Sequence, residues 1–208
     1  NDLGNLVSRT AAMIEKYFGG RIPDERSADI SSEADSEIIG LCRDIEAVVS
    51  SHMEELQFSV ALSEIWKLIS RCNKYIDETT PWILGKDPEK KGRLAEVLFN
   101  LAETIRIISI LIEPFMPDTA QSMRLNLGIS DNAILTWESA SKFGLYHSDT
   151  GVCKTQPIFP RIDISEELKS LQKIKLNKEK KESRGPDMTS EEIALIEYDD
   201  FAKVEMRT

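Results

Sequence analysis

The stretch at residues 63–84 reads SEIWKLISRCNKYIDETTPWIL. With the residues just before it, its apolar side chains recur at alternating steps of four and three, which places them on one helical face: Phe58, Leu62, Ile65, Ile69, Cys72 and Ile76. Pro81 ends this helix because it has no amide hydrogen and disfavours the helical conformation in Thr80. Trp82 follows at once, so the sequence predicts a core helix with a large aromatic ring at its end.

Two interpretations of Trp82 remain open at this point. It could be a platform on which a base stacks, or an ordinary core tryptophan, and its spacing alone favours the core. The other face of the helix carries Lys67, Arg71 and Lys74, which form a cationic stripe. Such a stripe is either a solvated surface or a contact for phosphates.

Further helices are predicted on both sides of this one. Residues 1–18 are amphipathic and end at two glycines, residues 33–54 follow a capping box, and residues 117–128 start at a proline and stop at a glycine. Residues 88–112 carry apolar side chains on several faces, which indicates a central helix. The fold class is therefore all-α, an antiparallel helical bundle.

Asn5 and Arg9 lie one helical turn apart in the first of these helices, so both side chains leave the same face. The amide and the guanidinium together offer donors and an acceptor that suit the edge of a base. A plain pair on a helix surface fits the spacing as well.

The C-terminal part is predicted to have a different character. Residues 130–163 lose the helical periodicity and read as an extended or short β-hairpin tail that packs on the bundle. Residues 166–190 are rich in Lys and Glu and read as a charged linker, and residues 191–208 have the composition of a strand that opens another domain. The expected divisions are 1–165, 166–190 and 191–208.

The composition narrows the classes of function. The chain has 26 Lys and Arg against 36 Asp and Glu, a net charge of −10, which argues against general binding of DNA or other polyanions. Residues 31–60 hold seven acids and only Arg43 as a base, so any bound nucleic acid must avoid that helix. No apolar run is long enough to span a membrane. The missing initiator Met, with no leader, suggests a fragment.

No site for chemistry is predicted within the chain. Cys42, Cys72 and Cys153 are odd in number and far apart, and His52 and His147 stand alone, which argues against a metal site and suits a cytoplasmic protein. The phosphate-binding, nucleophile-elbow and zinc motifs are missing. The carboxylates are expected to sit among solvated charges on helix faces.

Three segments resemble the anticodon-binding domain of bacterial methionyl-tRNA synthetases. They are NDLGNLVSRTAAMIEKYFGG, SEIWKLISRCNKYIDETTPWILGKD and RLAEVLFNLAETIRIISILIEPFMPDTA. The resemblance covers about residues 1–165. The last segment, IEYDDFAKVEMRT, is similar to the start of the OB-fold tRNA-binding domain that many members carry.

The resemblance implies roles for particular residues. The N-L-x-S-R motif puts the readers of the first base of the CAU anticodon on Asn5 and Arg9, and the T-P-W motif puts the stacking ring on Trp82. Asn73 is a weaker candidate. Possible contacts with tRNA phosphates are Lys67, Arg71, Lys74 and Lys86.

The resemblance also implies what the rest of the protein does. The family's catalytic domain, with its HIGH and KMSKS signatures, has no counterpart in this chain. The parent enzyme would attach methionine to its tRNA using ATP with Mg²⁺, whereas this part would bind methionine tRNA with no cofactor and no catalysis. The alternatives are a helical protein-interaction or scaffold module, and a similar bundle from a synthetase for another amino acid such as cysteine or leucine.

Overall fold

The computed structural model describes residues 2–21, 32–147, 150–152 and 157–159, and a few positions between 164 and 174. It divides into two compact units, Asn1–Pro160 and Arg161–Thr208. In the second unit the described residues are helical and exposed. The proposed start of an OB-fold domain at 191–208 and most of the linker lie outside the described residues.

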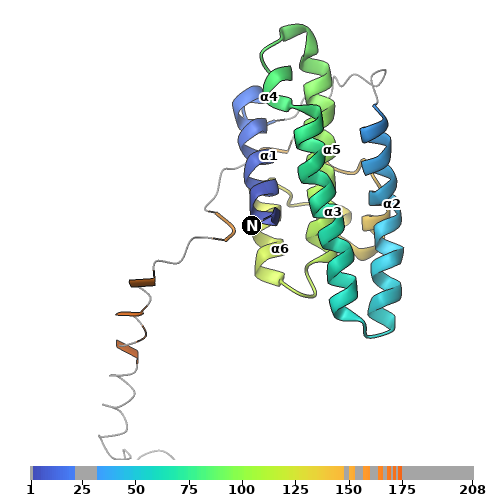
Figure 1. The fold of residues 1–208 in the computed structure, drawn as a ribbon, viewed down its shortest axis with the longest axis vertical. Helices are drawn as coiled ribbons and strands as arrows, with labels where there is room; N and C mark the ends of the chain where they lie inside the picture. Colours follow the sequence, from blue (N-terminus) through green and yellow to red (C-terminus); the bar gives the residue numbers. More distant parts are fainter. Residues whose placement is uncertain are drawn as a thin grey trace, which may run out of the picture. The chain divides into compact units, whose positions relative to one another are not determined.

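The first unit is a bundle of helices around one central helix (Figure 1). Its α-helices are α1 (Asp2–Phe18), α2 (Glu33–Glu54), α3 (Phe58–Thr79), α4 (Pro81–Leu84), α5 (Lys91–Leu111) and α6 (Pro117–Asn126). The 3-10 helices are η2 (Pro88–Lys90), η3 (Asn132–Ile134) and η4 (Trp137–Ser141). No strand occurs among the described residues, so the all-α prediction is confirmed.

Helix α5 is central because apolar residues cover nearly its whole circumference. From Leu94 to Leu111 almost every side chain is buried, and the helix packs against α1, α2, α3, α4 and α6. Helices α1 and α3 run in the same direction and α2 and α5 run the opposite way, while α1 and α2 flank the α3–α5 pair on opposite sides (Figure 1). The acidic helix α2 therefore lies away from α1.

The helix ends follow from local sequence. The Ser32 hydroxyl accepts from the Asp35 backbone and the Asp35 carboxylate accepts from the Ser32 backbone, which is the predicted capping box at the start of α2. Gly128, after α6, has φ of 67° and closely approaches the backbone of Gly151, where a side chain would not fit. That contact brings the tail back to the bundle.

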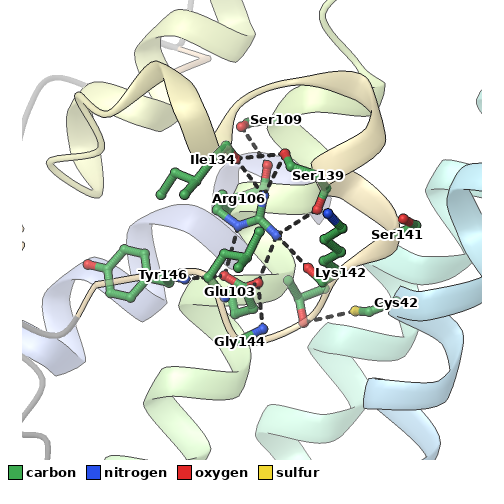
Figure 2. Close-up of polar contacts among 12 residues, drawn as sticks. Cys42, Glu103, Arg106, Ser109, Ile134, Ser139, Ser141, Lys142, Gly144 and Tyr146 are labelled. Atoms are coloured by element: carbon green, nitrogen blue, oxygen red, sulfur yellow. Dashed lines mark hydrogen bonds and ion pairs between the residues drawn. The ribbon is translucent and has the colours of Figure 1, made fainter.

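The described part of the tail is irregular, with two short 3-10 helices and no β-hairpin. Behind it is a buried ion pair, which corrects the expectation that the carboxylates lie among solvated charges on helix faces. Glu103 and Arg106 of α5 are both fully buried, and two guanidinium nitrogens donate to the Glu103 carboxylate at 2.7 and 2.8 Å. This pair is the centre of Figure 2.

The pair holds the tail on α5 through backbone groups. Arg106 donates to the carbonyl oxygens of Ile134 and Lys142 at 2.6 and 2.8 Å, and the Glu103 carboxylate accepts from successive backbone N–H groups at Gly144 (2.8 Å), Leu145 (3.0 Å) and Tyr146 (2.9 Å) (Figure 2). A buried charge is tolerated when it is paired and fully hydrogen-bonded, as here. The tail then reaches α1, where the Val152 N–H donates to the Gly20 carbonyl at 2.8 Å.

Candidate nucleic-acid interface

Trp82 lies in the sharp turn between α3 and α5. The chain leaves α3 at Thr80, which has φ of 45° and ψ of 59°, a left-handed conformation that β-branched residues rarely adopt. Pro81 is buried as the first residue of α4, whereas the Trp82 side chain remains 40% exposed. A strained turn that presents a half-exposed aromatic ring is typical of a binding site.

Close packing against α1 fixes the turn in place. A Cβ atom on Gly85 would lie 2.3 Å from Cε1 of Tyr17, so the chain after α4 can approach the Tyr17 ring only because position 85 is glycine. Helix α4 also packs against α5. The Trp82 ring is thus carried by a turn that two helices hold.

Arg9 comes from α1 and lies beside this ring. Its Cζ atom is 6.0 Å from the centroid of the Trp82 ring, at the limit of a cation–π contact. Its Nη2 atom donates to Oδ1 of Asp77 on α3 at 3.2 Å, with the Arg9 side chain 40% exposed. The structure therefore brings two of the three principal predicted residues together.

Asn5, the third, is exposed one turn before Arg9 on α1. No hydrogen bond joins its side chain to another of the described residues. Its amide is therefore available to a ligand, with both donor and acceptor groups. Asn73 lies nearby on α3 but is used structurally, since its amide donates to the carbonyls of Asp2 and Ile69 at 3.2 Å.

The predicted cations are in different situations. The Arg71 side chain is only 11% exposed and pairs with Glu37 at 2.6 Å and Glu78 at 3.1 Å. The hydrogen bond from Arg71 holds the pKa of Glu37 below its ordinary value, and the bond to Glu37 raises the pKa of Arg71. Its charge is therefore largely neutralised within the protein.

The three lysines are more accessible. Lys74 is 70% exposed with Glu78 at 3.4 Å, and Lys86 is exposed four residues after Trp82. Lys67 pairs with Glu64 at 2.6 Å and lines a surface groove between α2 and α3, on the side of α3 away from α1. Lys86 is thus close to Trp82 in the chain, whereas Lys74 shares its partner Glu78 with Arg71, which pairs with Glu37 of α2.

A buried network that the sequence did not reveal supports this part of α3. The Tyr75 hydroxyl and the Arg93 guanidinium both donate to the Asp35 carboxylate, joining α3, α5 and α2. Burial alone would raise the pKa of Asp35, but the hydrogen bonds from Arg93 and Tyr75 outweigh it and hold the pKa below its ordinary 3.8. Burial, reinforced by Asp35, raises the pKa of Tyr75. The network fixes α3 two residues before Asp77.

The chemistry that these groups offer is recognition of a planar ring. A half-exposed indole supplies a stacking surface, and an arginine and an asparagine supply hydrogen bonds at its edge. Within the described ranges no group of three or more His, Cys, Asp or Glu side chains could hold a metal ion. In those same residues no helix is both long and apolar enough to cross a membrane.

The chain is similar to proteins of known family and structure. Residues 35–184 match the family model described as the anticodon-binding domain of tRNA ligase. The methionine–tRNA ligase of Caldanaerobacter subterraneus is 49% identical over 207 residues, and that of Bacillus subtilis is 41% identical over 210 residues. In both cases the whole chain is aligned with 31% of the relative, so it spans about a third of these curated relatives.

Solved structures give the same result. The chain is similar to Mycobacterium tuberculosis methionyl-tRNA synthetase in complex with methionyl-adenylate, with a TM-score of 0.70 and 27% identity. The match covers 77% of this chain and 31% of that one. The resemblance noted in the sequence is confirmed, and relatives that are ligases for methionine disfavour a bundle from a cysteine or leucine enzyme.

Proposed function

The chain belongs to the family of anticodon-binding domains of tRNA ligases, and we propose that it recognises the CAU anticodon of methionine tRNA through Trp82, Arg9 and Asn5. One observation carries this proposal. The Arg9 guanidinium lies 6.0 Å from the Trp82 ring, and both side chains are accessible to solvent. Single-stranded loops are read by bases that stack on such rings and hydrogen-bond at their edges.

The mechanism follows from the groups on each side chain. The first anticodon base stacks on Trp82, whose ring is held by the turn at Thr80 and Pro81. Cytosine presents two acceptors and one amino donor on its pairing edge. The fork of donors on Arg9 suits the acceptors, and the amide oxygen of Asn5 suits the amino group. Uracil has a ring N–H where cytosine has an acceptor, so the same fork disfavours it.

The activity of the whole protein is also a proposal. The relatives are about three times longer, and the family's catalytic signatures are missing from this chain. We propose that the remaining part of the enzyme contains the catalytic domain and attaches methionine to its tRNA using ATP with Mg²⁺, while this part needs no cofactor. We also propose a cytoplasmic location, with which the free, buried side chains of Cys42 and Cys72 are compatible.

The test is binding of the 208-residue chain to an anticodon stem-loop with CAU and to one with a changed first base, at one fixed salt concentration. We expect preference for CAU, and a loss of about 1–3 kcal/mol of binding free energy in Trp82→Ala, the usual value for stacking of one base. Ile83→Ala is the matched control, because Ile83 is the next residue and is also an exposed apolar side chain.

Two results would contradict the proposal. Equal, salt-sensitive binding to both loops would mean that Trp82, Arg9 and Asn5 do not read the first base. No binding by the folded chain would favour the alternative of a helical protein-interaction module.

A further inference from the structure

A second exposed aromatic ring lies next to Asn5. The tail returns to α1 at residues 157–159, and a shallow pocket opens between the two segments. The pocket is lined by Gly4, Asn5, Ser8, Pro157, Ile158 and Phe159. Two of these side chains, those of Asn5 and Ser8, carry hydrogen-bonding groups, and three are apolar.

The tail is anchored here by one side chain and exposes the next. Ile158 packs against the hydrophobic core, whereas Phe159 is 42% exposed. A Cβ atom on Gly4 would lie 3.1 Å from Cδ2 of Phe159, so the edge of the ring rests on the backbone of α1 where there is no side chain. The ring is held along one edge while much of its surface stays open to solvent.

Phe159 and Trp82 flank the two polar readers. Asn5 and Arg9 are one turn apart on α1, with Trp82 beside Arg9 and Phe159 beside Asn5. The site therefore contains two half-exposed rings, each with a hydrogen-bonding side chain at its edge. Base recognition in single strands uses that combination repeatedly, one ring for each base.

We propose that Phe159 is the stacking surface for the second anticodon base, next to Asn5, which reads the first base. This inference rests on the proposed function, because it assumes that the first base stacks on Trp82. A second ring makes the site a reader of two consecutive bases. The bundle alone does not provide this second surface, since the tail supplies Phe159.

The experiment pairs three variants of the 208-residue chain with two RNA loops. The loops are the CAU stem-loop and the same loop without a base at the second anticodon position. Phe159→Ala removes the ring, Phe159→Leu keeps an apolar side chain over Gly4, and Phe159→Trp keeps an aromatic face. Leu125→Ala is the control, since Leu125 is an exposed apolar residue on α6.

We expect Phe159→Ala and Phe159→Leu to weaken binding of the CAU loop by about 5- to 150-fold, the range for stacking of one base. Phe159→Trp and Leu125→Ala should bind as the unchanged protein does. The loop that lacks the second base should bind to all four variants with the same affinity as to the unchanged protein. A ring that merely covers Gly4 would not give this dependence on one base.

The opposite results are distinguishable. If Phe159→Ala and Phe159→Leu bind the CAU loop as the unchanged protein does while Trp82→Ala is impaired, Phe159 is only a packing residue and the proposed function stands. If the variants weaken both loops equally, the ring does not stack on the second base. If Trp82→Ala has no effect either, the proposed function fails and this inference fails with it.

Discussion

Among the described residues, the Arg9 guanidinium pairs with Asp77 and lies beside the Trp82 ring, and the pair with Asp77 is the contact that competes with a ligand. Its ion pair with Asp77 joins two side chains that are 40% and 67% exposed, and such surface pairs contribute about 0–1 kcal/mol. A base that offers acceptors to the guanidinium can therefore displace or share this contact at little cost. The contact with Trp82 keeps the guanidinium next to the ring on which the base would stack.

Replacing Arg9 with lysine separates charge from geometry. Arg9→Lys keeps the positive charge and a partner for Asp77, but it loses the planar fork of donors. We expect the variant to bind the CAU loop about tenfold more weakly, corresponding to about 1.4 kcal/mol, and to lose the preference over a loop with a changed first base. The free energy of unfolding in urea should change by less than about 1 kcal/mol.

Arg43→Lys is the control for this substitution, because Arg43 is exposed on α2, on the far side of the bundle from α1. It should alter neither affinity nor preference. A persistent preference for CAU in Arg9→Lys would show that the fork does not read the base.

Single residues also show how much of the candidate site could be predicted from the sequence. The sequence around Pro81 predicted a ring at a helix end, which the structure has, but its spacing alone favoured a buried core tryptophan, whereas Trp82 is 40% exposed. Arg71 could not be predicted in the same way. One of its partners, Glu37, lies 34 residues earlier on a different helix, so only the packing of α2 against α3 brings the two together.

At the scale of elements, α5 combines what the sequence predicted with what it could not. Its apolar residues on all faces indicated a central helix, and the structure confirms this position. The same pattern gave no hint that Glu103 and Arg106 would be buried with it. Apart from each other and the Ser139 hydroxyl, their partners are backbone groups of the tail, which have no signature in a sequence.

The substitution Glu103→Gln tests how much the Glu103–Arg106 pair contributes to stability. Glutamine fills the same space but removes the counter-charge of a buried guanidinium, and loss of one partner of a buried ion pair costs about 3–5 kcal/mol. We expect the free energy of unfolding in urea at pH 7 to fall by that amount. Amide hydrogens at residues 144–146 should also exchange faster, since the Glu103 carboxylate accepts from all three.

Glu113→Gln is the matched control. Glu113 pairs with Arg124 at 2.7 Å, but its side chain is 47% exposed, so water screens the interaction. This variant should lose less than about 1 kcal/mol. If both variants lost the same free energy of unfolding, the buried Glu103–Arg106 pair would contribute no more to stability than the exposed Glu113–Arg124 pair.

At the scale of the whole molecule, a net charge of −10 has to be reconciled with binding of RNA. The arrangement of the helices separates most of the acidic residues from the proposed binding site. The acids of residues 31–60 belong mostly to α2, and α2 lies across the α3–α5 pair from α1, where Asn5 and Arg9 are (Figure 1). Among the described residues few accessible cations lie beside the site, so we expect stacking and hydrogen bonds to contribute more to affinity than phosphate contacts.

Salt dependence measures that balance directly. For single strands, the logarithm of the binding constant falls with the logarithm of salt concentration with a slope of about −0.7 for each phosphate contact. If Lys74 and Lys86 each contact one phosphate, the slope for the CAU loop should be about −1.4. Lys86→Gln should reduce its magnitude by about 0.7, because Lys86 is exposed four residues after Trp82.

Lys67→Gln is the control, since Lys67 is equally exposed but lies on the side of α3 that faces α2. The salt dependence of binding by Lys67→Gln should have the same slope as that of the unchanged chain. A much steeper slope that neither substitution alters would place the phosphate contacts on another surface. A slope near zero would mean that Lys74 and Lys86 contact no phosphate and that binding depends on the bases alone.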